Sequence, residues 1–282
     1  MSPTGTEVLT AATRALAAAG VPDPARDARR LFSHALGVES GRLTLVLPET
    51  VDASGLQAFD RLITRRCARE PVSQLIGRRA FYGRDFIVTA DVLDPRPETE
   101  TLIEAALALP FEQVLDLGTG SGCILLTLLA ENPGARGLGV DLSVAAVRVA
   151  LRNARALRLD QRARFVVSDW TREVEGTFDL IVANPPYIAA NEFGGLAPEV
   201  RDWEPRIALT DNADGLAAYR EILVCAPAFL MPQGRLVVEI GPTQARAVTD
   251  MAIAAGFDRA TVIRDLDGRD RVIVMGWDEM PF

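Results

Sequence analysis

The sequence has no lysine, one histidine and three cysteines, and each shortage argues against a class of function. A single histidine, His34, excludes a histidine-based catalytic triad and a multi-histidine metal site. Its helical surroundings indicate a packed or surface residue. Cys67, Cys123 and Cys225 are odd in number and far apart, which argues against a disulfide framework and a cysteine-rich zinc site. We therefore expect chemistry that uses no metal.

Positive charge is also scarce, since 30 arginines face 38 acidic residues and leave a net charge of −8. Binding to nucleic acid usually depends on neutralising phosphates with Lys and Arg, so no direct nucleic-acid binding is expected. No apolar run approaches the ~20 residues that cross a bilayer. The start of the chain, Met1 to Glu7, lacks the basic and apolar regions of a signal peptide. We expect a cytoplasmic protein without a membrane partner.

The 282 residues suggest two domains and a connector. Apolar residues recur at helical intervals through residues 1–77, and Thr4 with Glu7 has capping-box spacing, so a small helical bundle is predicted there. The spacing of the apolar residues changes after Gly77. Short strand-like runs on either side of Gly83 predict a β-hairpin connector over residues 78–95.

Residues 96–282 alternate between strand and helix patterns, which predicts an α/β domain with a mostly parallel sheet covered by helices on both faces. One helix is expected around residues 216–230. The expected strands are residues 114–117, 137–140, 164–167, 178–183, 235–240, 260–264 and 271–275.

A glycine-rich loop follows the first of these strands. It contains Gly118, Thr119, Gly120, Ser121 and Gly122. Glycine permits positive φ and lets a ligand approach the backbone closely, although the same glycines also suit a tight turn without a ligand. The third glycine of a dinucleotide fingerprint is replaced by Cys123. The G-x-G-x-G spacing favours S-adenosylmethionine (SAM) over a nicotinamide cofactor.

Acidic and aromatic residues at the ends of the next strands extend this prediction. Asp141 lies 19 residues beyond Gly122, where a carboxylate can accept hydrogen bonds from ribose hydroxyls or cap the following helix. Asp169 and Trp170 follow another strand. They could bind an adenine ring, and Trp170 could equally just cover the sheet end.

The most informative motif is the turn Asn184, Pro185, Pro186 and Tyr187 after a buried strand. The lone pair of a conjugated NH2 group is shared with its π system, so such a nitrogen is a poor nucleophile. Acceptors that grip both N–H groups would make the lone pair available. The Asn184 side-chain oxygen and the Pro185 carbonyl are such acceptors, because proline brings no competing N–H. Tyr187 would form a wall of the slot.

Further motifs occur in a fixed order along nearly the whole chain. They are Pro71-Val72 with Leu75 and Gly77, Arg96-Pro97-Glu98-Thr99-Glu100, Val114 through Gly122, Asn184 through Ile188, Glu204-Pro205-Arg206, Asp214-Gly215-Leu216, Glu239-Ile240-Gly241, and Asp265-Leu266 with Gly268 through Arg271. In this order the sequence resembles the peptide chain release factor glutamine N5-methyltransferases. It departs from their pattern at Gln74, at Asp94 and at residues 210–212, all outside the cofactor loop and the Asn184 turn.

The resemblance implies a Rossmann-like SAM-dependent methyltransferase domain behind an N-terminal helical domain that helps to dock the protein substrate. It implies SAM contacts from residues 118–122, Asp141, Trp170 and Asn184. It also implies that residues 184–187 hold the glutamine of the Gly-Gly-Gln loop of a release factor. Three alternatives remain at this stage: methylation of a ribosomal-protein glutamine, adenine-N6 methylation of DNA, and SAM or NAD binding without catalysis.

Overall fold

The computed structural model describes residues 2–277, which divide into two compact units. The helical unit runs to Arg78 and includes a second segment, Ala197–Trp203. The sheet unit comprises Arg79–Leu196 and the chain from Glu204 onward. Among the described residues, no helix is both long and apolar enough to cross a membrane.

The helical unit begins with a capped helix. The Thr4 side chain accepts a hydrogen bond from the Glu7 backbone N–H, while the Glu7 carboxylate accepts one from the Thr4 N–H, so the predicted capping box is present. The helices are α1 (Gly5–Ala18), α2 (Pro24–Leu36), η1 (Ser40–Arg42), α3 (Leu43–Val46), α4 (Ala53–Cys67), α5 (Val72–Ile76) and, from the second segment, α9 (Pro198–Arg201).

One apolar core holds the helical unit together. Leu16, Leu31 and Phe32 are completely buried, and the rings of Phe32 and Phe59 pack edge to face at 4.9 Å between centroids. These residues recur at the intervals that place them on one face of each helix, as the sequence predicts.

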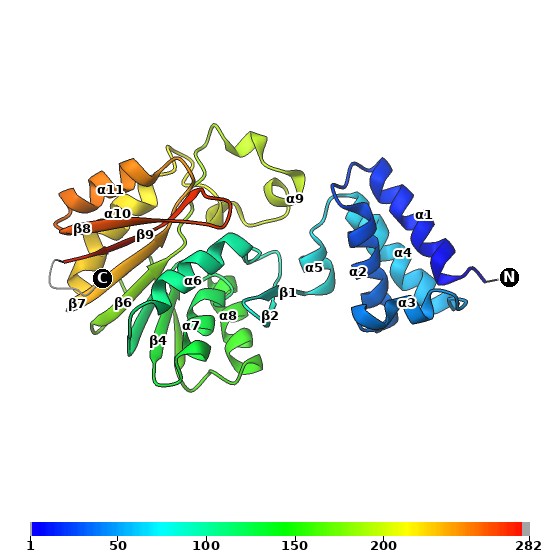
Figure 1. The fold of residues 1–282 in the computed structure, drawn as a ribbon, viewed down its shortest axis with the longest axis horizontal. Coiled ribbons are helices and arrows are strands. Elements are labelled where there is room, and N and C mark those ends of the chain that lie inside the picture. The colour runs from blue at the N-terminus through cyan, green and yellow to red at the C-terminus, as the bar shows by residue number, and fades with distance from the viewer. Residues whose placement is uncertain (1, 278–282) are drawn as a thin grey trace. The chain divides into compact units, whose positions relative to one another are not determined.

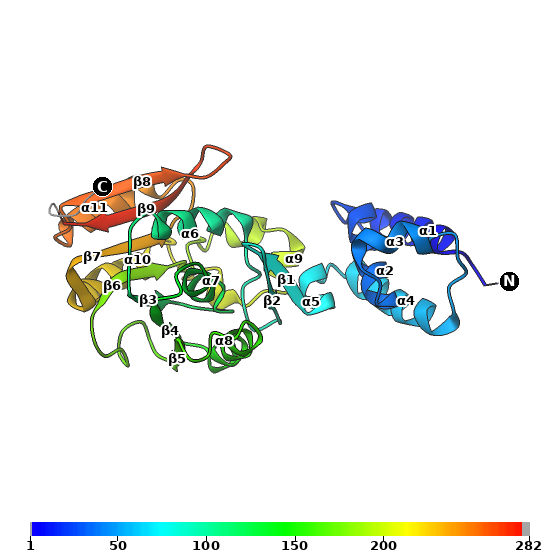
Figure 2. The same cartoon turned by 60° about the horizontal axis from the view of Figure 1, so that its bottom comes forward.

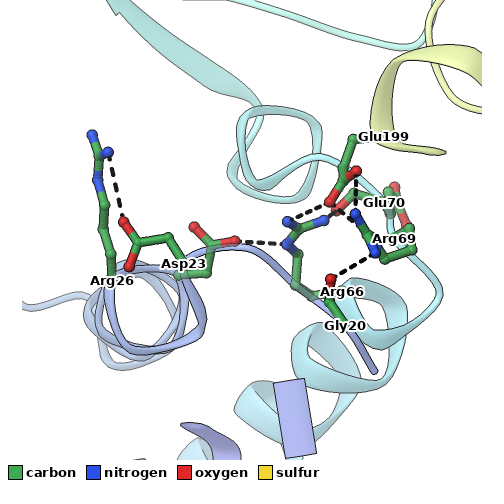
Figure 3. A network of polar contacts seen from close by, with 8 residues as sticks. Gly20, Asp23, Arg26, Arg66, Arg69, Glu70 and Glu199 are labelled. Atoms are coloured by element: carbon green, nitrogen blue, oxygen red, sulfur yellow. Dashed lines mark hydrogen bonds and ion pairs between the residues drawn. The ribbon is translucent and has the colours of Figure 1, made fainter. Parts of the chain in front are cut away.

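A buried ion-pair network fixes the segment Ala197–Trp203 within the helical unit (Figure 3). Arg66 Nε lies 2.8 Å from an Asp27 carboxylate oxygen, and Arg66 Nη2 lies 2.9 Å from Glu199 Oε1. Arg69 meets both oxygens of Glu199, with Nε 2.8 Å from Oε1 and Nη2 2.7 Å from Oε2. The Arg66 side chain is only 6% exposed, so Glu199 neutralises charge that water cannot reach.

The hairpin connector forms as expected. Strands β1 (Arg78–Phe81) and β2 (Arg84–Ile87) are joined by Tyr82 and Gly83, both at positive φ. Two positive φ values match a type I′ turn, whose twist suits a two-residue hairpin. The backbone N–H of Ile87 donates to the Asn153 side chain at 2.7 Å, which fixes the hairpin on the sheet unit.

The large sheet has seven strands in the order β5-β4-β3-β6-β7-β9-β8, with β5 at one edge and β8 at the other (Figure 2). Strands β3 to β7 pair in parallel, and β9 is antiparallel to both of its neighbours. The predicted mostly parallel sheet is therefore confirmed. Its strands are β3 (Gln113–Leu117), β4 (Arg136–Asp141), β5 (Ala163–Val167), β6 (Phe178–Ala183), β7 (Leu230–Glu239), β8 (Arg259–Arg264) and β9 (Asp270–Gly276).

Helices cover both faces of this sheet (Figure 1). On one face α6 (Glu100–Leu107), α7 (Cys123–Glu131) and α8 (Val144–Ala156) share a core with the hairpin residues Phe81 and Phe86. On the other face α10 (Ala217–Cys225) and α11 (Ala245–Ala254) share a second core. The 3-10 turns of this unit are η2 (Pro97–Thr99), η3 (Phe193–Gly195), η4 (Arg206–Ala208) and η5 (Ala226–Phe229).

Two boundaries differ from the sequence predictions between α10 and β7. The helix expected around residues 216–230 is α-helical only to Cys225 and continues as the 3-10 turn η5 to Phe229, and the strand expected from residue 235 begins at Leu230. Pro227 explains the helix end, because its ring clashes with the carbonyl four residues earlier and it has no N–H. The strand begins early because Leu230 pairs with Phe178 before a shift in register.

Candidate functional site

The glycine-rich loop leaves the end of β3 and bends toward the end of β4. The backbone N–H groups of Gly118 and Thr119 donate to the Val140 carbonyl at 2.9 and 2.8 Å. Gly118 and Gly120 have positive φ, and a Cβ added at either would meet nothing within 4 Å. The loop backbone therefore borders open space, where a ligand can approach it closely.

Asp141 anchors this loop from the last position of β4. One carboxylate oxygen accepts from the Gly120 N–H at 2.9 Å, and the other accepts from the Ser143 N–H at 2.8 Å. The cap of α8 is the Ser143 hydroxyl, which accepts from the Ala146 N–H. Burial raises the pKa of Asp141, and the two N–H bonds lower it again in part. The carboxylate is thus oriented by the backbone on both sides.

The segment after β5 holds Trp170 in a left-handed conformation with φ of 50°. The Ser168 hydroxyl donates to the Trp170 carbonyl at 2.9 Å and stabilises this bend. Trp170 packs against the core beside α10 and also faces the pocket described below. Its position is therefore compatible with both roles expected from the sequence, which are to bind an adenine ring and to cover the end of the sheet.

The turn after β6 places Asn184 beside the 3-10 turn η2. The Asn184 side-chain Nδ2 donates to the Thr99 hydroxyl at 3.3 Å, and Oδ1 accepts no hydrogen bond from the described residues. The Tyr187 hydroxyl donates to Glu239 at the end of β7, at 3.4 Å. An amide oxygen without a protein donor is thus available in this turn.

One pocket in the sheet unit brings together most of the predicted residues, at the carboxyl ends of β3, β4, β5 and β6. Ligands in open α/β sheets bind at this edge. The predicted residues that line it are Gly118, Thr119, Gly120, Ser121, Asp141, Asp169, Trp170, Asn184 and Pro186.

Three predicted residues do not line this pocket. Gly122 packs against α8, since a Cβ there would approach Ala150 to 3.2 Å. Pro185 is buried, and Tyr187 lies behind the turn against Glu239. The structure places these residues next to the pocket wall, and their predicted roles remain predictions.

Sequence reasoning did not select several further residues at this site. Arg96 lines the pocket, and its Nη2 lies 2.5 Å from an oxygen of the buried Glu204. Thr99 lines the pocket too. Glu239 does not line it and is buried behind the pocket wall, with 1% of its surface exposed. Their motifs were visible in the sequence, but only the fold brings them beside Asn184.

Two buried carboxyl groups beside the pocket have strongly raised pKa values. Burial raises the pKa of Asp116 to about 7, against the lowering effect of the Thr119 hydroxyl. Burial also raises the pKa of Glu239 to about 7, although Thr99, Arg271 and Tyr187 each lower it. Perturbed carboxyl groups of this kind cluster at functional sites.

The pocket fits SAM in the chemistry of its walls. The glycine loop leaves space for a ligand against its backbone, and the buried Ser121 hydroxyl has no partner among the described residues. Asp141 offers carboxylate oxygens for ribose hydroxyls, and Trp170 offers an aromatic face. Within residues 2–277, no group of three or more His, Cys, Asp or Glu residues is arranged to hold a metal ion.

Comparison with known proteins identifies both units. The family described as PrmC N-terminal domain matches residues 7–77, and the family described as methyltransferase small domain matches residues 88–196. A methyltransferase structure from Pyrococcus furiosus aligns with a TM-score of 0.54 at 19% identity, over 77% of this chain and 98% of that one. At this identity the likeness concerns the fold alone.

Two named relatives extend over almost the whole chain. The release factor glutamine methyltransferase of Cereibacter sphaeroides is 55% identical over 95% of this chain and 96% of its own length. That of Rhodospirillum rubrum is 49% identical over 92% of this chain and 81% of its own length. With these relatives and both family matches, the chain belongs to the release factor glutamine methyltransferase family.

Proposed function

We propose that this protein transfers the methyl group of SAM to the side-chain amide nitrogen of the glutamine in the Gly-Gly-Gln loop of peptide chain release factors. The observation that carries the proposal is the Asn184 turn, which presents an uncommitted amide oxygen in a pocket that also contains the glycine loop and Asp141. Family membership supports the same substrate and cofactor.

The cofactor supplies an activated methyl group, so that the amide nitrogen bonds to the methyl carbon as the sulfur–carbon bond breaks and one amide proton leaves to solvent. The work of the protein is then positioning and electrostatics. Asn184 Oδ1 and the Pro185 carbonyl accept the two N–H bonds of the substrate amide. Asp141 and the loop Gly118–Gly122 hold the nucleoside and the amino-acid end of the donor, and Asp169 with Trp170 holds the adenine.

Two further features belong to this proposal. In this proposal the helical domain of residues 1–77, where the PrmC N-terminal domain match lies, docks the release factor. Residues 78–95 form the connector and residues 96–282 the catalytic domain. The protein works in the cytoplasm, where release factors act.

The decisive experiment changes Asn184 to alanine. Loss of an acceptor that orients the nitrogen lowers kcat by about a hundredfold or more, while calorimetry still detects SAM binding through the glycine loop and Asp141. Asn191→Ala, an exposed asparagine outside the pocket, is the control and keeps the wild-type rate. Near wild-type turnover in Asn184→Ala would contradict the proposed mechanism.

The substrate is tested by offering labelled SAM together with a release factor, a ribosomal protein and DNA. Mass spectrometry then locates the label. We expect it on the release-factor glutamine; label on the ribosomal protein alone, or on adenine, would replace the proposal with the corresponding rival.

A further inference from the structure

Asn184 can perform its proposed role only when its side-chain amide is turned one way. The carboxamide oxygen accepts hydrogen bonds, whereas the NH2 group only donates them. With NH2 toward the substrate, two donors would face each other and the substrate nitrogen would lose its acceptor. Some part of the protein must therefore fix this orientation.

Thr99 is the side chain that Asn184 contacts on the protein side. Its hydroxyl oxygen lies 3.3 Å from Asn184 Nδ2, and the residue is 2% exposed, so water does not compete for the hydroxyl. A hydroxyl can both donate and accept, however. The Thr99 contact alone would tolerate either orientation of the Asn184 amide.

Glu239 removes this ambiguity. It ends β7, the strand next to β6, so its side chain lies behind the turn that carries Asn184. An ionised carboxylate only accepts. The Thr99 side chain lies near enough to this carboxyl group to favour its charged form. Oε2 of Glu239 has no hydrogen-bond partner among the described residues, so a buried carboxylate acceptor is open to the Thr99 hydroxyl.

We propose that Thr99 and Glu239 are positioning residues for methyl transfer. The carboxylate of Glu239 accepts a hydrogen bond from the Thr99 hydroxyl. The Thr99 oxygen must then accept a hydrogen bond from Asn184 Nδ2, so Asn184 Oδ1 faces the substrate amide. Tyr187 adds a second donor to the same carboxylate. This inference rests on the proposed function, since it assigns the residues that prepare its acceptor.

The protonation state of Glu239 gives a readout that a purely structural role would not move. A neutral carboxyl group can donate to Thr99, whose own hydrogen then turns toward Asn184 and favours the wrong amide orientation. The pKa of Glu239, raised by burial to about 7, places this change near neutral pH. The charged and titratable groups around Glu239 are Glu98 on η2, Cys123 on α7, Tyr187 after β6, Tyr219 on α10 and Arg271 on β9.

The test uses the full chain with SAM and a release factor. Thr99→Val keeps the shape of the side chain and removes the hydroxyl, so kcat falls about tenfold to a hundredfold, as when a group that orients a metal ligand is removed. The larger effect is on kcat and not on SAM affinity. Thr99→Ser restores the hydroxyl and most of the rate. Thr127→Val, a buried threonine on α7 whose hydroxyl has no partner among the described residues, is the control and keeps kcat.

A pH series completes the test. The wild-type kcat declines as pH falls from about 8 to about 6, while Glu239→Gln, which cannot ionise, loses this dependence. Wild-type kcat in a correctly folded Thr99→Val, or an unchanged pH profile in Glu239→Gln, overturns the inference. If the wild-type enzyme leaves the release factor unmethylated, the proposed function itself fails, so the two failures are distinguishable.

Discussion

At the scale of single residues, Asp141 combines two tasks in the pocket. Its two oxygens accept backbone N–H groups from Gly120 and Ser143, and these bonds set its position. Because a carboxylate has about four lone-pair sites, each oxygen retains acceptor capacity for a ribose hydroxyl. The structural and the ligand-binding readings of this residue are thus compatible.

Replacement of Asp141 by alanine is expected to weaken SAM binding at least tenfold. Charge-assisted hydrogen bonds of this kind contribute about 1.5–3 kcal/mol, and the glycine loop also loses its anchor. Asp141→Asn, which keeps one acceptor, should fall between alanine and the wild type. Calorimetry measures the affinities, and Asp160→Ala, an exposed aspartate, serves as the control. A dissociation constant within twofold of the wild type in Asp141→Ala would rule out the ribose contact.

The sequence predicted the residues of the pocket better than their partners. Gly118, Asp141 and Asn184 could be selected because each stands in a local pattern at the end of a strand. The contact of Asn184 with Thr99 joins residues 85 positions apart, and that of Tyr187 with Glu239 joins residues 52 apart. No local pattern encodes such pairs, because they depend on which strands become neighbours.

At the scale of elements, the backbone carbonyls at the carboxyl end of helix α6 are hydrogen-bonded by a buried side chain from strand β7. Arg235 of β7 is 3% exposed. Its Nη2 donates to the carbonyls of Ala106 and Leu109 at 2.7 and 2.6 Å, and Nη1 reaches the Pro110 carbonyl at 3.2 Å. A helix end leaves four carbonyls without partners. This guanidinium satisfies that of Ala106, together with the carbonyls of Leu109 and Pro110 just beyond the helix.

Arg235→Met should therefore destabilise the protein by about 3 kcal/mol or more. The methionine fills most of the space but leaves buried carbonyls without donors, each at a cost of about 1–3 kcal/mol. Urea unfolding followed by circular dichroism measures the change. Arg246→Met is a suitable control, since that side chain is 95% exposed and should change the free energy of unfolding by less than about 0.5 kcal/mol. Equal stability of the two variants would show that Arg235 is not needed as a cap.

Elements with strong local signals were predicted well, and those set by distant contacts were not. The capping box at Thr4 and the glycine turn of the hairpin were readable because their cause lies within four residues. The early start of β7 was missed because Leu230 gains its strand conformation from pairing with Phe178. A buried arginine such as Arg235 gives no sign in the sequence that it will cap a helix.

At the scale of the whole molecule, the chain leaves the sheet unit after Leu196, contributes Ala197–Trp203 to the helical unit, and re-enters the sheet unit at Glu204. Glu199 joins residues 130 and 133 positions away through its bonds to Arg69 and Arg66. Burial raises the pKa of Glu199, but the hydrogen bonds from Arg69 and Arg66 lower it by more. The pKa therefore ends below its ordinary value of 4.5. The ionised form is therefore the one that stabilises the native state.

Glu199→Gln should lower the free energy of unfolding by about 3 kcal/mol at neutral pH, because the buried Arg66 loses its anionic partner on this side. A carboxyl group with a depressed native pKa contributes fully above about pH 4.5, and its contribution is lost as the pH falls through the native value. The difference in the free energy of unfolding between the variant and the wild type should thus be smaller at about pH 3 than at neutral pH. Unfolding in urea at both pH values tests this, with the exposed Glu49→Gln as the matched control. A gap that is absent at pH 7, or that widens in acid, would show that this ion-pair network does not secure the segment Ala197–Trp203.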